Sequence, residues 1–226
     1  MKICVVTLDQ ASPEVIFQDE RLLNIRRLAD AGLYGLLESV NTPDPWKTFE
    51  TSQSPVATAA SLWTALAQAG LQVAFVQQKE AVNGFADLKQ KLTQNGESVC
   101  FIDRGLESAP DLEDDARASN YYLSFDEQIG SLMEALDDQT LLLLLSVGGA
   151  SQPGFFVLVS PNCPLSGEHD GATVLDLAPT VLDLAGCEIP SSMQGRSLVA
   201  GMEKRVPTAE DHEKIIYDRL AGLGYV

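Results

Sequence analysis

Five consecutive leucines, Leu141 to Leu145, constrain the fold of this chain more than any other feature. The run has no polar face, polar residues precede it, and Gly148 and Gly149 close it. A short apolar run between turn residues is typical of a strand buried on both faces of a sheet. A buried helix is the alternative, but the shortness of the run and the two glycines favour the strand.

Ligands of open α/β sheets gather at the carboxyl ends of the strands, so chemistry is expected directly after the leucine run. The segment at that position is Ser146-Val147-Gly148-Gly149, and it contains no catalytic side chain. This absence limits every functional hypothesis below.

Alternating strand and helix patterns predict the rest of the fold. Apolar, β-branched runs predict strands at 3–8, 33–40, 72–76, 98–102, 140–145 and 154–159. Helical spacing predicts helices at 22–29, 61–69, 85–92, 118–136, 174–185 and 209–220, with Pro179 in the first turn of its helix. A turn is expected at 11–13, a polar loop at 41–46 and an acidic loop at 105–116. We therefore expect one α/β domain over residues 1–226, a three-layer α/β/α sandwich with a largely parallel sheet.

Charge and composition exclude several classes of partner. The 226 residues carry 15 Lys and Arg against 32 Asp and Glu, a formal charge of −17, which disfavours nucleic acid and anionic lipid surfaces. The four cysteines are widely spaced, which argues against a disulfide framework or a zinc cluster. Asp9 interrupts the first apolar run too early for a signal peptide, and no run approaches the ~18 residues that span a bilayer. We expect a soluble cytoplasmic protein without a nucleic-acid or membrane partner.

Several motifs resemble one known family. Residues 176–186 read DLAPTVLDLAG, and Ile189-Pro190 and the stretch MQGRSL at 193–198 follow them. This string is similar to the C-terminal signature of the alkaline phosphatase superfamily, in particular its type I phosphodiesterase/nucleotide pyrophosphatase branch, where its role is structural. Residues 6–9 resemble the first strand of that family, residues 42–51 its nucleophile loop, and residues 122–130 the helix before its "S-D-H-G" strand. The family's cap insertions after the nucleophile loop are expected to be absent.

The resemblance implies a centre with two divalent metals that clamp the reacting oxygens and activate a hydroxyl nucleophile. It assigns the nucleophile to Thr42 and one metal ligand to Asp9. A second ligand pair falls at Asp103 and Glu107, where Glu107 replaces a histidine. The "D-H" pair falls at Val147 and Gly148, which cannot bind metal through side chains. The family's final histidine ligand is expected shortly before the strand at 154–159, where residues 151–153 read Ser-Gln-Pro.

The histidine count agrees with a reduced site. A two-zinc centre of this kind normally uses about three imidazoles, whereas this chain has only His169 and His212. His212 is expected on the surface of the terminal helix. His169, within Glu168-His169-Asp170, is a candidate ligand for one metal or a surface-turn residue. The carboxylates that remain could hold one divalent cation, such as Mg²⁺, Mn²⁺, Ca²⁺ or Zn²⁺.

Two functions follow from the resemblance. The first is a catalytically impaired homologue that acts as a binding or regulatory domain, with a small-molecule phosphate ester or a protein as its partner. The second is an active, reduced hydrolase of phosphoric or sulfuric esters that uses Thr42 with one cation on Asp9 and Asp103. Nucleotide binding through a glycine-rich or P-loop motif has no support, because neither motif is present. The oligomeric state stays open, since the apolar tail 220–226 could pack on its own chain or on another subunit.

Overall fold

The computed structural model of the chain describes residues 1–8, 11–56, 60–77, 84–94, 99–103, 115–148, 153–163 and 165–202. The described strands are β1 (Lys2–Thr7), β2 (Leu33–Glu38), β3 (Val73–Gln77), β4 (Val99–Asp103), β5 (Thr140–Ser146), β6 (Gly154–Val159), β7 (Gly167–Glu168) and β8 (Ala172–Thr173). The described helices are α1 (Pro13–Gln18), α2 (Leu23–Ala31), α3 (Pro45–Thr51), α4 (Leu62–Gln68), α5 (Gly84–Gln94), α6 (Asp115–Ala135) and α7 (Val174–Leu184). The expected helix at 209–220 lies outside these ranges. Among the described helices, none is long and apolar enough to span a membrane.

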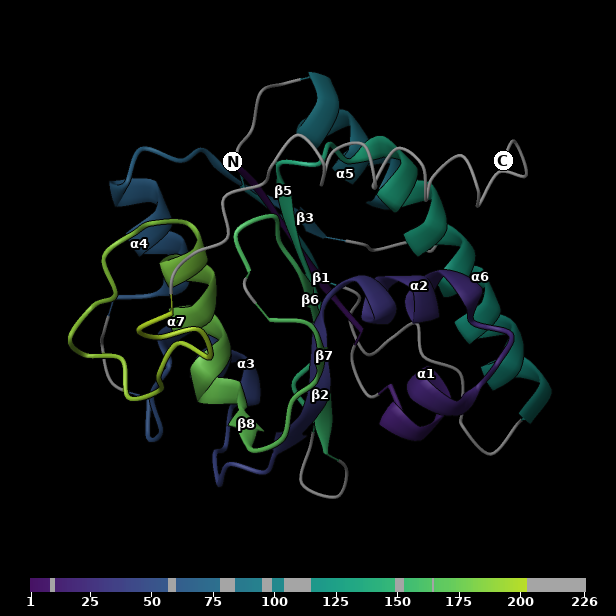
Figure 1. Ribbon diagram of the computed structural model, residues 1–226, viewed down its shortest axis with the longest axis horizontal. Helices are drawn as coiled ribbons and strands as arrows, with labels where there is room; N and C mark the ends of the chain where they lie inside the picture. The colour runs from purple at the N-terminus through teal and green to yellow at the C-terminus, as the bar shows by residue number, and fades with distance from the viewer. Residues whose placement is uncertain are drawn as a thin grey trace.

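The structure confirms the predicted three-layer α/β/α architecture. Helices α3, α4 and α7 cover one face of the central sheet, and α1, α2 and α6 cover the other (Figure 1). The strand order is β3-β4-β1-β5-β6-β2-β7, with β8 also paired to β2. The sheet is largely parallel, as predicted. Strand β6 is the exception and runs antiparallel to both neighbours, β5 and β2.

The leucine run forms β5, which is buried along its whole length between β1 and β6. Leu141, Leu143 and Leu145 belong to the core beneath α3, α4 and α7, and Leu142 and Leu144 to the core beneath α1, α2 and α6. Each leucine is at most 3% exposed, which corresponds to roughly 2 kcal/mol of apolar burial apiece. One strand therefore serves two cores, which is why its sequence shows no alternation.

Two short helices differ from the sequence prediction. Residues 11–13 were expected to form only a turn, but α1 begins at Pro13, and the expected loop 41–46 gives way to α3 at Pro45. Each helix has proline in its first turn, and Asp44 caps α3 by accepting a hydrogen bond from the Lys47 backbone N–H. With six and seven residues, they are too short to show a helical period in the sequence.

Pro179 lies in the middle of α7, so its expected place in the first turn is wrong. A proline inside a helix deprives the carbonyl four residues earlier, here that of Leu175, of its N–H donor. The Ser52 hydroxyl supplies a replacement, donating to the Leu175 carbonyl oxygen at 2.6 Å. Ser52 Oγ also accepts from the Gly195 N–H at 2.9 Å. The interior proline is therefore tolerated because a side chain from another segment satisfies the orphaned carbonyl.

Gly195 completes this contact between the end of α3 and the start of α7. A Cβ atom at Gly195 would lie 2.1 Å from the Leu175 carbonyl oxygen, so only glycine fits there. The neighbouring Asp176 carboxylate accepts from the Arg196 N–H at 2.8 Å and from the Thr173 hydroxyl at 2.7 Å. The described contacts of residues 176–196 are thus structural, in agreement with the role that the motif implied.

Candidate functional site

The carboxyl ends of four parallel strands meet at one edge of the sheet. Strands β4, β1 and β5 are parallel neighbours, and β2 runs parallel to them because it is antiparallel to β6. Residues Asp103, Thr7, Ser146 and Glu38 end these strands. This is the edge at which open α/β sheets bind ligands, and among the described residues it carries Asp103 and the loop with Thr42.

Asp103 ends β4 beside the end of β1. The pairing of Val6 with Ile102 places Asp103 opposite Thr7, one strand spacing away, or about 4.8 Å. Asp9 follows two residues later but lies outside the described residues, as does Glu107. The strand order agrees with the expectation that Asp9 and Asp103 lie close together, which stays a prediction.

Thr42 lies in the loop between β2 and α3, half-buried, and contacts the first turn of α3. Its Oγ1 is 2.7 Å from Thr48 Oγ1 and accepts from the Asp44 N–H at 3.3 Å. The Asp44 carbonyl oxygen lies within hydrogen-bond distance of both hydroxyls, 2.9 Å from Thr48 Oγ1 and 3.3 Å from Thr42 Oγ1, and either hydroxyl can donate in the Thr42–Thr48 bond. Both of these partners are neutral, and neither is a general base of the kind that activates a hydroxyl nucleophile.

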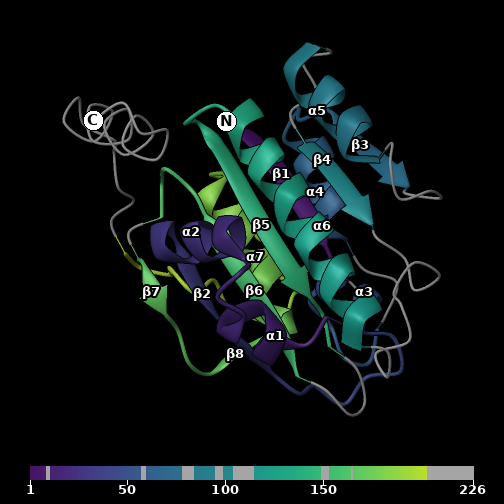
Figure 2. The same ribbon diagram turned by 90° about the vertical axis from the view of Figure 1, so that its right-hand side faces the viewer.

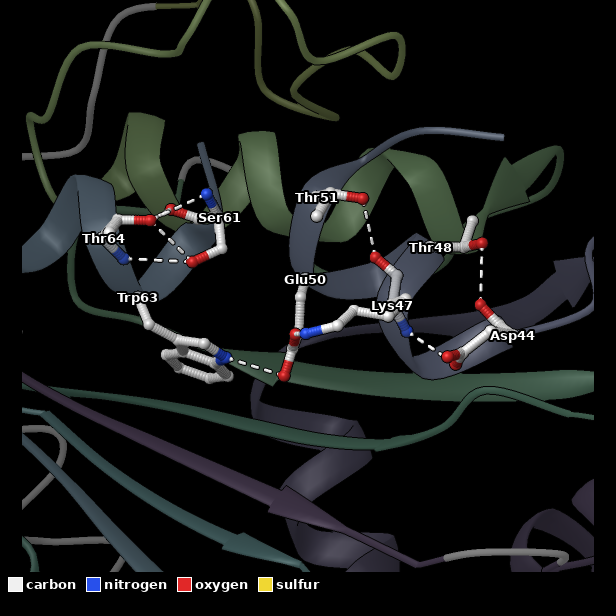
Figure 3. Close-up of polar contacts among 8 residues, drawn as sticks. All are labelled: Asp44, Lys47, Thr48, Glu50, Thr51, Ser61, Trp63 and Thr64. Carbon is white, nitrogen blue, oxygen red and sulfur yellow. Dashed lines mark hydrogen bonds and ion pairs between the residues drawn. The ribbon is translucent and has the colours of Figure 1, made fainter. Parts of the chain in front are cut away.

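Side-chain contacts stabilise α3 and α4 and link the two helices (Figure 3). Glu50 of α3 joins the two helices, since its carboxylate accepts from the Trp63 indole N–H at 3.2 Å and pairs with Lys47 at 2.9 Å. Ser61 and Thr64 form a capping box at the start of α4. The bond from Trp63 to Glu50 ties α4 to α3, the helix that directly follows the Thr42 loop.

The ends of β2 and β4 are well separated along the sheet. Strands β6, β5 and β1 lie between them, so the two ends are four strand spacings apart, about 19 Å. Figure 1 shows α3 beside the lower part of the sheet, on the same face as α7. Thr42 and Asp103 therefore share one edge of the sheet but extend from strands that are not neighbours.

Known proteins share this architecture. No protein-family model matches the chain. The phosphonate monoester hydrolase of Silicibacter pomeroyi matches with a TM-score of 0.68 at 13% identity, covering 92% of this chain and 78% of the hydrolase. A protein in complex with its substrate D-glucosamine-2-N,6-O-disulfate matches with a TM-score of 0.63 at 14% identity, covering 92% of this chain and 81% of that protein. A Vibrio parahaemolyticus protein of the alkaline phosphatase superfamily has a TM-score of 0.58 at 10% identity, covering 93% and 71% of the two chains.

The fold is that of the alkaline phosphatase superfamily. An N-acetylglucosamine-6-O-sulfatase of Bacteroides thetaiotaomicron is 30% identical over 118 residues, which cover 42% of this chain. The chain spans only 21% of that sulfatase's length. The structural matches have low identity and show the fold alone, and none of them singles out the type I phosphodiesterase branch.

The end of β5 tests whether this domain fits the two-metal centre that the sequence resemblance implies. Val147 has an apolar side chain and Gly148 has none, so neither offers a ligand. Ser146 is fully buried on the face of Leu142 and Leu144, and its Oγ has no hydrogen-bond partner in the described part of the chain. Within the described ranges, no three His, Cys, Asp or Glu side chains are grouped as a metal site requires. The described side chains at 146–148 therefore do not supply the Asp-His ligand pair that the resemblance expects at this position.

His169 lies far from the end of β4, which carries Asp103. Its backbone N–H donates to the Tyr34 carbonyl oxygen at 2.8 Å, which places it beside β2 at the outer edge of the sheet. The neighbouring strand β7 is five strand spacings from β4, about 24 Å. The structure therefore does not bring His169 together with Asp103. His212 lies outside the described residues.

Asp126 is a buried polar residue that the sequence did not single out. It lies on α6, is 4% exposed, and accepts from the backbone N–H groups of Asn24 and Ile25 at 3.0 and 2.8 Å. It thereby caps the first turn of α2, where the N-cap residue Leu22 has no side-chain acceptor. The resemblance of residues 122–130 contained this position, but only the packing of α6 on α2 reveals its partner.

Proposed function

We propose that this chain is a catalytically impaired member of the alkaline phosphatase superfamily that serves as a binding or regulatory domain. The observation that carries the proposal is the end of β5, where Val147 and Gly148 stand at the position that the resemblance assigns to an Asp-His ligand pair. The Thr42 contacts agree with it, because the hydroxyl bonds only to a neutral hydroxyl and to backbone in the described part of the chain. In this proposal the fold provides a binding surface and does not catalyse a reaction.

Metal stoichiometry is the first test. Purified protein is titrated with Zn²⁺ and Mn²⁺, and bound metal is read by elemental analysis after gel filtration. The proposal expects bound metal near zero. Two tightly held ions would contradict it and would show that the assignment of Val147 and Gly148 is out of register.

Turnover is the second test. Activity is assayed on p-nitrophenyl phosphate, bis-p-nitrophenyl phosphate, p-nitrophenyl sulfate and p-nitrophenyl phenylphosphonate, with Zn²⁺, Mn²⁺, Mg²⁺ and Ca²⁺ each added. The proposal expects rates equal to those of buffer with metal alone. A metal-dependent rate that survives a second purification step would overturn it.

A second function, a reduced ester hydrolase, draws on one observation. Thr42 is half-exposed at the sheet edge that also carries Asp103, and the resemblance makes it the nucleophile. One divalent cation on Asp9 and Asp103 would supply the Lewis acid for such a reaction. This function expects one bound ion that is lost in Asp103→Ala, and a rate that Thr42→Ala abolishes. The matched control Thr64→Ala, on the exposed side of α4, should retain that rate.

A further inference from the structure

A cavity of about 500 Å³ lies on the face of the sheet opposite α3, beneath the short helix α1. Its wall comes from α1, its floor from the middle of β2, and its rim from Pro153 before β6 and Glu168 in β7. The lining residues that decide its chemistry are Glu14, Phe17, Tyr34, Leu36, Pro153 and Glu168. None of them belongs to the candidate site described above.

The cavity exists because α1 is too short to cover the sheet beside it. Six residues make a helix of about 9 Å, and Figure 2 shows α1 over the β6–β2 part of the sheet. Tyr34 and Leu36 alternate with the buried residues of β2 and point to this face. Leu36 stays 48% exposed, whereas a leucine on a covered sheet face is normally buried.

The floor and the wall are apolar and aromatic. The rings of Phe17 and Tyr34 lie 5.4 Å apart in a tilted arrangement, and Phe17 also meets the buried Phe155 edge-on at 5.7 Å. Phe17 is thus held by packing on the core. A volume of about 500 Å³ falls within the usual range of about 300–1,000 Å³ for small-molecule sites.

The rim of the cavity carries two carboxylates whose negative charge is not balanced by a described basic side chain. Glu14 and Glu168 are exposed carboxylates from different elements, and neither has an ion-pair partner among the described residues. The described lining contains no lysine or arginine, and the chain as a whole carries a formal charge of −17. The local charge and the overall field therefore both favour a cation.

We propose that this cavity binds a small organic cation, an ammonium group attached to an apolar body. The body would lie on Leu36 and Pro153, and the ammonium would meet the two carboxylates and the faces of the aromatic rings, which attract cations. This goes beyond the proposed function and does not depend on it, because the cavity uses neither the end of β5 nor Thr42.

The test uses three probes with one shared phenyl body: phenethylammonium, the neutral phenethyl alcohol and the anionic hydrocinnamate. Each is titrated into ¹⁵N-labelled protein at pH 7, and amide shifts are followed by two-dimensional NMR. The ammonium should shift the amides of Phe17, Tyr34 and Leu36 and bind at least fivefold more tightly than the alcohol. The anion should bind more weakly than the alcohol.

Charge-neutralising variants locate the cation. Glu14→Gln and Glu168→Gln should each weaken phenethylammonium binding about threefold, and the double variant about tenfold, the size expected for partly exposed ion pairs. Glu134→Gln, on the exposed side of α6, changes the net charge equally and should leave the affinity unchanged. Leu36→Asn should weaken the ammonium and the alcohol alike.

Three results would overturn the proposal. One is equal affinity for the ammonium and the alcohol. Another is an unchanged affinity in the double glutamine variant, whose circular dichroism confirms that it is folded. The third is equal weakening by Glu134→Gln, which would assign the binding to net charge rather than to this cavity.

Discussion

The Ser52 hydroxyl and the Pro179 ring should be energetically coupled. In the native chain, Ser52 Oγ supplies the donor that Pro179 cannot give to the Leu175 carbonyl, and it also accepts from the Gly195 N–H. Ser52→Ala removes both bonds and leaves two partly buried groups unpaired, so we expect a loss of about 3 kcal/mol. Alanine keeps the Cβ at this left-handed position (φ 51°), so the backbone cost is unchanged.

Pro179→Ala restores an N–H that can reach the Leu175 carbonyl within α7. In that background Ser52→Ala leaves only the Gly195 N–H unpaired, and its cost should fall to about 2 kcal/mol. The coupling energy of the double-mutant cycle is therefore about 1 kcal/mol. Effects of proline on the unfolded chain occur in both arms of the cycle and cancel.

The cycle is measured by urea unfolding, followed by circular dichroism, for the four proteins. A second cycle pairs Pro179→Ala with Ser61→Ala, which removes the cap of α4 at a cost of about 1 kcal/mol and should show no coupling. Equal m-values across the series confirm that the free energies can be compared. A coupling below about 0.3 kcal/mol, the usual limit of additivity, would refute the role given to Ser52.

Two further predictions concern buried and surface carboxylates. Asp126→Ala should destabilise the chain by about 3 kcal/mol, lowering Tm by roughly 10 °C in calorimetry, because it leaves the first turn of α2 uncapped; a similar loss in the exposed control Glu127→Gln would contradict this. The pKa of Asp137 lies below its ordinary value of 3.8 because the Thr140 hydroxyl and then Lys2 stabilise the carboxylate. Its contribution to stability is present above pH 3.8 and is lost as the pH falls through the lower folded pKa. The free energy of unfolding of Asp137→Asn should therefore decrease less steeply with falling pH than that of the native protein. The free energy of unfolding is measured by urea titration at a series of pH values below 4. If it falls equally steeply with pH in the native protein and in Asp137→Asn, the prediction is wrong.

The sequence predicted the framework of the fold because the framework depends on local patterns. The leucine run, the β-branched run of β1 and the amphipathic stripe of α6 each show their burial in their own spacing. Pro179 shows where this reasoning stops. A lone proline in a helical pattern suggests a first turn, and only the distant Ser52 explains why an interior position is stable here.

The candidate site was predictable only in part, for a similar reason. The sequence predicts that Asp103 ends one strand and that Thr42 follows another, and both lie at the carboxyl edge. The strand order that separates β2 from β4 by four spacings depends on long-range pairing, as does the outer position of His169. Asp9 and Glu107 lie outside the described residues and stay predictions.

The uniform composition of β5 leaves its alignment with its neighbours to be set elsewhere. Usually a one-residue slip of a strand moves polar side chains into the core, and this penalty specifies the register. A slip within five leucines exchanges one leucine for another on both faces, so the run itself scarcely opposes it. The ends must therefore fix the register: Thr140 donates to Asp137 at 2.6 Å, and the Ser146 carbonyl oxygen lies 2.3 Å from where a Cβ on Gly154 would be. Gly154→Ala would act on this alignment and not on the apolar core, so a strand of five buried leucines is positioned by a hydroxyl and a glycine.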